Sequence, residues 1–179
     1  MPCPHNEITI VQRSQRQSAV AAAAYQSGEK LFCEYDQQVK HYPEKRGIVH
    51  NEILLPANAP PEYADRNTLW NAAEAVEKQW NSQLARRWVL TIPREIPPDQ
   101  YAVLVREFCE QQFVSKGMIA DFAIHAARFH NTSGRSNQPY PPCGFSTCRM
   151  AALSVPRFRQ GHKPCGSWEA ISHVRPLPS

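Results

Sequence analysis

The sequence predicts one folded domain of mixed α and β structure, in the α+β or the α/β class. Three observations predict it. Strand-like and helix-like segments alternate from residue 7 to residue 125. The apolar fraction is 42% and the charged fraction 20%, as in folded globular proteins rather than disordered chains. A length of 179 residues is enough for one domain with a buried core and marginal for two.

The first three elements follow from local residue types. Residues 7–12 contain two isoleucines and a valine and predict an opening strand. The alanine-rich segment 18–31 predicts a helix, because alanine is the strongest helix former, and Ser18 can cap its N-terminus. Residues 47–56 predict a short strand that ends at a proline.

Four further elements complete the alternation. Residues 66–86 predict a helix whose apolar side chains recur at spacings of three and four: Leu69, Ala73, Val76, Trp80 and Leu84. Residues 87–93 predict a strand. Two prolines open a predicted helix at residues 98–115, and residues 118–125 predict the last clear strand.

The composition changes after residue 125. Residues 1–125 contain 13 Lys and Arg against 15 Asp and Glu, whereas residues 126–179 contain 7 against 1. Residues 127–179 also hold seven prolines and seven serines and sustain neither strand nor helix periodicity. We therefore expect residues 127–179 to be an irregular, basic, Pro-, Ser- and Cys-containing tail. The basic tail alone does not indicate DNA binding.

The sequence contains neither a long apolar run nor a signal-peptide layout, so we expect a cytoplasmic protein. Its six cysteines form no tight framework and predict free thiols. In the tail, Cys143, Cys148, His162 and Cys165 have a spacing that fits no standard zinc finger.

Five segments in register give the chain a family resemblance. The sequence resembles the N-terminal relaxase domain of the MobA/MobL plasmid mobilisation proteins, which are HUH endonucleases. The segments are SAVAAAAYQSGEKL (18–31), GIVHNEILLP (47–56), NTLWNAAEAVEKQWNSQLAR (67–86), TIPREI (91–96) and VSKGMIADFAIH (114–125). The resemblance implies an α+β fold with a mainly antiparallel sheet flanked by helices. It covers a relaxase-like domain at residues 1–126, followed by the tail at 127–179.

The resemblance also implies an activity. Such relaxases nick one DNA strand at a plasmid transfer origin and stay attached to the new 5′ end through a phosphotyrosine. The implied partners are single-stranded DNA at the origin and other relaxosome proteins. The implied cofactor is a divalent metal, Mg²⁺ or Mn²⁺, which polarises the scissile phosphate.

Tyr25 matches the nucleophile position of the family. By residue type alone, a tyrosine on an alanine-rich helix more often packs against a sheet, so its role rests on the resemblance. Tyr35 and Tyr42 lie in a polar stretch and are weaker candidates. The candidates for DNA contact are Arg13, Arg16, Lys30 and Lys116.

The metal site departs from the family pattern. The resemblance implies three histidine ligands, one at the end of a strand and a His-x-His pair on the neighbouring strand. His125 matches the first ligand, but residues 126–179 contain no His-x-His. One nitrogen ligand does not hold a catalytic metal, so metal binding and enzyme activity are in doubt.

Three interpretations remain open. The chain can be an intact relaxase that takes ligands from its tail, or a relaxase truncated or frameshifted after about residue 125. It can also be a non-catalytic remnant that binds single-stranded DNA or a partner protein. The abrupt change in composition favours the second interpretation and a degenerate relaxase activity.

Overall fold

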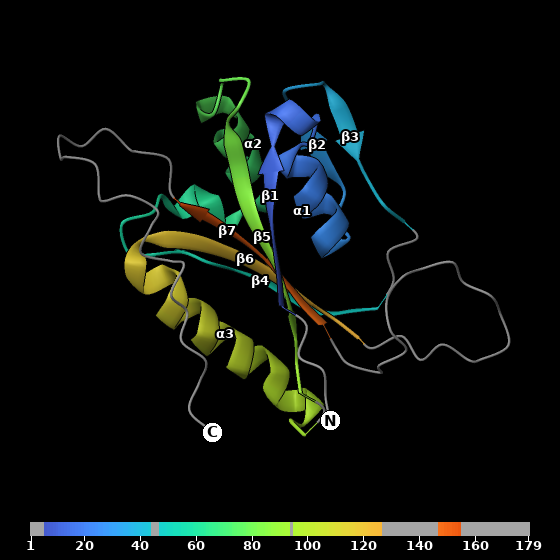
Figure 1. Ribbon diagram of the computed structural model, residues 1–179, viewed down its shortest axis with the longest axis vertical. Helices are drawn as coiled ribbons and strands as arrows, with labels where there is room; N and C mark the ends of the chain where they lie inside the picture. The colour runs from blue at the N-terminus through green and yellow to red at the C-terminus, as the bar shows by residue number, and fades with distance from the viewer. Residues whose placement is uncertain (1–5, 44–46, 94, 127–146, 155–179) are drawn as a thin grey trace, which may run out of the picture.

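The computed structural model describes residues 6–43, 47–93, 95–126 and 147–154. Seven strands and three α-helices lie in this part of the chain (Figure 1). In chain order they are β1 (Asn6–Gln12), α1 (Ala19–Ser27), β2 (Leu31–Cys33), β3 (Gln38–Lys40), β4 (Ile48–Leu54), α2 (Arg66–Val76), β5 (Gln83–Thr91), α3 (Tyr101–Gln112), β6 (Met118–His125) and β7 (Thr147–Ser154). None of the helices in these ranges is long and apolar enough to cross a membrane.

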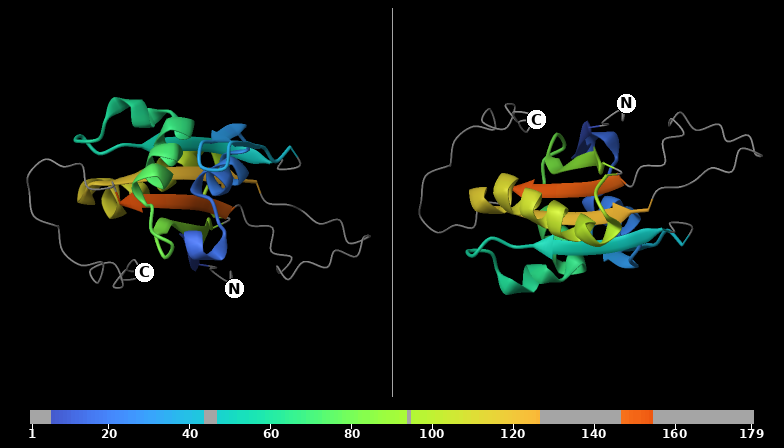
Figure 2. Two further views of the ribbon diagram at one scale, coloured as in Figure 1. Left: turned by 90° about the horizontal axis from the view of Figure 1, so that it is seen from above. Right: turned by 90° about the horizontal axis from the view of Figure 1, so that it is seen from below.

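Five of the strands form one sheet in the order β1-β5-β7-β6-β4, and every neighbouring pair is antiparallel. Helices α1 and α2 cover one face of this sheet and α3 covers the other, as the two views of Figure 2 show. Strands β2 and β3 form a separate antiparallel hairpin beside α1. The predicted α+β class, with a mainly antiparallel sheet flanked by helices, is confirmed.

Two apolar cores lie on opposite faces of the sheet, and β6 is therefore buried on both sides. Residues of β6 alternate between the cores, as strand geometry requires: Ile119 packs with α1 and α2, whereas Phe122 and Ile124 pack with α3. Burial on both faces explains why 118–125 is an almost continuous apolar run. By the same alternation, His125 lies on the α1 face of the sheet.

The predicted start of α1 is confirmed. The Ser18 hydroxyl accepts a hydrogen bond from the Ala21 amide at 3.1 Å, which caps the helix. The helix ends earlier than the predicted residue 31, because Gly28 adopts a left-handed conformation with φ 74°. Four small or medium apolar residues of α1 are fully buried, which lets the helix lie close against the sheet: Ala19, Val20, Ala23 and Ala24.

The predicted helix at residues 66–86 is too long. Helix α2 ends at Val76, and the last four residues of the predicted range belong to β5. The helical spacing was misleading at its C-terminal end: Trp80 is 70% exposed in a turn, and Leu84 is buried as a strand residue. Pairing of β5 with β1 decides the boundary, and this pairing is not visible in local periodicity.

Strand β7 corrects the prediction that residues 127–179 are irregular. Its residues 147–154 pair with β5 on one side and with β6 on the other, so β7 is the central strand of the sheet. Backbone hydrogen bonds on both edges stabilise a strand even where the sequence lacks alternation. The rest of 127–179 lies outside the described residues, and the domain boundary at residue 126 stays a prediction.

Candidate active site

An open cleft of about 780 Å³ lies between β1, α1 and the β2–β3 hairpin. Its wall combines residues from these elements with one residue of β5. The lining residues are Ile8, Thr9, Ile10, Val11, Gln12, Gln15, Arg16, Gln17, Ser18, Ala21, Ala22, Tyr25, Asp36, Lys40, Tyr42 and Arg87. Of the tyrosines considered from the sequence, Tyr25 and Tyr42 lie in the cleft.

Tyr25 projects from the last turns of α1 into this cleft and is 37% exposed. Its neighbours Ala24 and Gln26 are buried, which fixes the face of the helix that Tyr25 occupies. The Tyr25 ring meets the Tyr42 ring edge to face, with centroids 5.4 Å apart and planes at 85°. A phenol held at the mouth of an open cleft can reach a large substrate.

Three cations line the cleft: Arg16, Lys40 and Arg87. The Arg87 Nε donates to the Thr9 hydroxyl at 3.3 Å, and Lys40 forms an ion pair with Asp36. The Lys40 hydrogen bond holds the pKa of the Asp36 carboxyl below its usual range, and the same bond raises the pKa of Lys40. Three positive groups against one carboxylate favour an anionic ligand such as a phosphodiester.

The other candidates for DNA contact lie elsewhere. Arg13 donates to the backbone oxygens of Glu74 and Glu77 at the end of α2, and its Cζ lies 4.3 Å from the centroid of the Tyr35 ring. Lys30 is exposed after α1 and is not part of the cleft lining. Lys116 is exposed just before β6, at the opposite end of that strand from His125. Of the four, the structure brings only Arg16 to Tyr25.

His125 is buried at the end of β6 and does not line the cleft. The strand register places Thr147 opposite His125 and Arg149 opposite Ala123. Strand β7 lies beside His125, where the resemblance implies a His-x-His pair, and its residues there are Thr147, Cys148 and Arg149. Among the side chains that the structure describes, no cluster of three His, Cys, Asp or Glu could hold a metal ion. The described residues around His125 therefore do not fit a three-histidine site.

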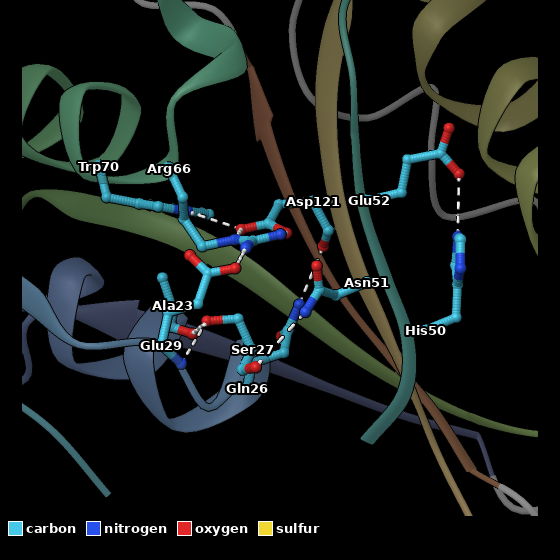
Figure 3. A network of polar contacts seen from close by, with 10 residues as sticks. All are labelled: Ala23, Gln26, Ser27, Glu29, His50, Asn51, Glu52, Arg66, Trp70 and Asp121. Atoms are coloured by element: carbon cyan, nitrogen blue, oxygen red, sulfur yellow. Dashed lines mark hydrogen bonds and ion pairs between the residues drawn. The ribbon is translucent and has the colours of Figure 1, made fainter.

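A buried polar network joins α1 and α2 to β6 (Figure 3). Asp121 accepts two bonds from Arg66 at 2.9 Å and one from the Trp70 indole at 2.8 Å. Burial raises the pKa of the Asp121 carboxyl, and these bonds oppose the rise. Gln26, next to Tyr25, donates to the Asp121 backbone oxygen at 3.0 Å. This bond ties the helix that carries Tyr25 to the middle of β6.

A second polar cluster lies on the opposite face of the sheet. Glu52 of β4 accepts bonds from Arg106 of α3 and lies 3.2 Å from the His50 Nε2. Despite partial burial, which raises it, the pKa of Glu52 is lowered by these two partners. Figure 3 shows His50 and Glu52 across the sheet from Asp121. The cluster therefore has no access to the Tyr25 cleft.

Lys40 and Arg87 carry no sequence signal for this cleft, and Tyr42 is a weaker candidate than Tyr25 by sequence alone. Lys40 and Tyr42 depend on the hairpin, which was not predicted although FCEYDQQVK contains strand formers around a polar turn. Arg87 lies on a predicted strand, but the face that it occupies follows only from the pairing of β5 with β1.

The comparisons with known proteins agree with this architecture. Residues 17–134 match the model of the MobA/MobL family. The conjugal transfer protein TraA of Agrobacterium fabrum is 38% identical over 135 residues, which are 70% of this chain and 12% of that protein. The mobilization protein MobL of Acidithiobacillus ferridurans is 33% identical over 124 residues, which are 69% of this chain and 32% of that protein.

A solved structure described as "Molecular Basis of Vancomycin Resistance Transfer in Staphylococcus aureus" is also similar. It superposes with a TM-score of 0.69 at 29% identity, over 84% of this chain and 70% of the other. The chain spans less than a third of the length of these two curated relatives. The family match covers the three α-helices and strands β2 to β6, including Tyr25 and His125, and the chain belongs to the MobA/MobL family of conjugal transfer and mobilisation proteins.

Proposed function

We propose that this chain binds single-stranded DNA of a plasmid transfer origin in the Tyr25 cleft, together with other relaxosome proteins in the cytoplasm. Tyr25 is the nucleophile of strand transfer in this proposal. We also propose that strand transfer is slow in this chain, because β7 carries Thr147, Cys148 and Arg149, and no histidine, at the positions beside the end of β6.

The single observation that carries the proposal is the composition of the cleft. The cleft is lined by Tyr25, which is 37% exposed, by Arg16, Lys40 and Arg87, and by a second aromatic ring, that of Tyr42. Cations bind the phosphate backbone, and aromatic rings stack on unpaired bases, so this combination suits a single strand better than a duplex.

The chemistry required of Tyr25 is a transesterification. Its phenolic oxygen attacks the scissile phosphorus, a P–O bond forms, and the bond to the 3′ oxygen of the preceding nucleotide breaks. That oxygen leaves as a 3′ hydroxyl and takes up the proton that the phenol releases to solvent. The 5′ end stays attached as a phosphotyrosine, which conserves the bond energy for religation. Arg16, Lys40 and Arg87 offset the charge of the phosphates.

The register of β7 supports slow strand transfer. A relaxase of this family uses a divalent metal, Mg²⁺ or Mn²⁺, held by three histidines, and here Thr147 and Arg149 occupy the positions beside His125 and Ala123. Without metal-assisted charge stabilisation, we expect a loss of roughly a thousandfold or more in rate. The same observation favours the alternative function, a non-catalytic DNA-binding or partner-binding remnant.

The test combines binding and covalent capture. Fluorescence anisotropy with a labelled 20-nucleotide thymidine oligomer measures binding to the full chain. We expect affinity to fall with salt with a logarithmic slope of about −2, for three phosphate contacts. Long incubation with single strands from candidate transfer origins, followed by denaturing electrophoresis, detects the covalent adduct.

Tyr25→Phe abolishes the adduct, because only the hydroxyl oxygen can form the link, and leaves binding almost unchanged. Tyr35→Phe is the matched control, since Tyr35 lies outside the cleft. An adduct that persists in Tyr25→Phe contradicts the assignment of the nucleophile. Binding without any adduct in the wild-type chain favours the non-catalytic alternative, and an absence of binding rejects the whole proposal.

A further inference from the structure

We infer that Tyr42 is a positioning residue, which holds the phenol of Tyr25 in one orientation within the cleft. The effect on strand transfer rests on the proposed function, because the orientation of Tyr25 matters only if Tyr25 attacks a phosphodiester. The contact by which the Tyr42 ring restricts the Tyr25 ring can be measured without DNA.

The contact between the two rings has the geometry of a favourable aromatic pair. The centroids are 5.4 Å apart and the planes are nearly perpendicular, at 85°. In this arrangement the positive edge of one ring meets the negative face of the other. Both residues are 37% exposed, so the pair closes part of the cleft wall while both rings remain open to a ligand. Tyr42 therefore restricts a side chain that the surrounding core does not enclose.

The hairpin that precedes Tyr42 is held against α2. The Asn67 side chain accepts a bond from the Phe32 amide at 2.8 Å. The Asn71 side chain accepts from the Glu34 amide at 2.9 Å and donates to the Phe32 backbone oxygen at 2.8 Å. These three bonds hold the β2–β3 hairpin against α2. Strand β3 ends at Lys40, two residues before Tyr42.

Lys40 and Asp36 give the end of the hairpin a second function in the cleft. Their ion pair lies in the cleft lining with Tyr42, and the hydrogen bond to Asp36 is the main cause of the raised pKa of Lys40. The hairpin and the residues that follow it thus place a cation for a phosphate and an aromatic ring for the nucleophile on one wall. Helix α1 carries the nucleophile on the other wall.

Attack on phosphorus requires the oxygen to lie in line with the bond that breaks, so freedom of the Tyr25 ring reduces the fraction of productive encounters. An aromatic pair of this kind raises the population of the Tyr25 orientation that packs against Tyr42, relative to other orientations, by about two- to tenfold. We expect Tyr42→Ala to lower the rate of adduct formation by that factor, with a smaller change in DNA affinity.

The experiment places 3-fluorotyrosine at position 25 in the full chain and records its fluorine resonance without DNA. In the otherwise unaltered chain we expect one narrow resonance, displaced from free fluorotyrosine by the ring of Tyr42. Tyr42→Ala moves the resonance toward the free value, whereas Tyr42→Phe keeps most of the displacement because it keeps the ring. Tyr35→Ala is the matched control, since Tyr35 belongs to the same hairpin but not to the cleft.

Each outcome decides the inference. The inference is overturned if Tyr42→Ala leaves the resonance unchanged, or if Tyr35→Ala moves it as far as Tyr42→Ala does. It is also overturned if Tyr42→Phe and Tyr42→Ala lose the same share of the displacement. Thermal unfolding of each variant verifies that the fold is intact. A second arm adds the thymidine oligomer. If the Tyr42 effect is present and the oligomer does not move the resonance, the proposed function fails while the ring contact stands.

Discussion

Arg66 binds both carboxylate oxygens of Asp121, through its Nε and its Nη2, with each hydrogen bond 2.9 Å long. The pair joins the first turn of α2 to the middle of β6, and both side chains are almost fully buried. The Trp70 indole also donates to Asp121, and Glu29 pairs with the remaining nitrogen of Arg66. The network connects the helix layer, which includes the helix that carries Tyr25, to the sheet.

Substitution of Asp121 by Asn should destabilise the protein strongly. The substitution leaves the buried Arg66 charge with only Glu29, and breaking one partner of a buried pair costs about 3–5 kcal/mol. Equilibrium unfolding in urea measures the change. The double variant Arg66→Met, Asp121→Leu removes both charges and should recover most of the loss. A loss below about 1 kcal/mol in Asp121→Asn means that water compensates the pair.

Substitutions of Arg13 and Arg16 should have opposite effects: one should lower stability and the other should weaken DNA binding. Arg13→Gln removes bonds to the carbonyl oxygens at the end of α2, so it should cost about 1–3 kcal/mol in unfolding free energy and leave DNA affinity nearly unchanged. Arg16→Gln should leave stability nearly unchanged and reduce the salt slope of single-strand binding by about 0.7. Urea unfolding and anisotropy titrations at several salt concentrations test both. The reverse pattern would show that Arg13, not Arg16, contacts the phosphates.

Histidines at positions 147 and 149 should restore a metal site. The register places these positions opposite His125 and Ala123, and residues two apart in a strand lie on the same face. Isothermal titration with Mn²⁺ or Zn²⁺ should show one site in Thr147→His, Arg149→His that is absent when His125 is also replaced by Ala. We expect faster nicking of plasmids carrying candidate origins with Mg²⁺ or Mn²⁺. Equal nicking by the unaltered chain contradicts the proposal that its site is incomplete.

The ion pair of Glu52 and Arg106 should make the unfolding free energy depend on pH in the acidic range. The folded state lowers the pKa of Glu52, so its contribution is present above the ordinary glutamate pKa, about 4.3, and is lost as pH falls through the lowered value. The difference in unfolding free energy between the wild type and Glu52→Gln should therefore be constant near neutral pH. It should shrink as pH falls below about 4. Urea unfolding at several pH values tests this, and a difference that grows in acid contradicts the sign.

The sequence by itself determined the features that depend on short stretches of chain. The Ser18 cap, the alanine-rich helix that carries Tyr25 and the apolar run of β6 follow from residue types and spacing. The missing His-x-His pair is also a sequence fact. Interactions within each short segment favour these elements over other conformations of the same segment, so they could be predicted without the fold.

Only the tertiary structure decided the features that depend on distant partners. The end of α2 at Val76 follows from the pairing of β5 with β1, and β7 becomes a strand because β5 and β6 each present a free edge to it. The cleft likewise brings Arg87 of β5 and the hairpin residues Lys40 and Tyr42 to Tyr25. Backbone pairing and side-chain burial between segments far apart in sequence supply the stabilising free energy here, and no local pattern of residues contains that information.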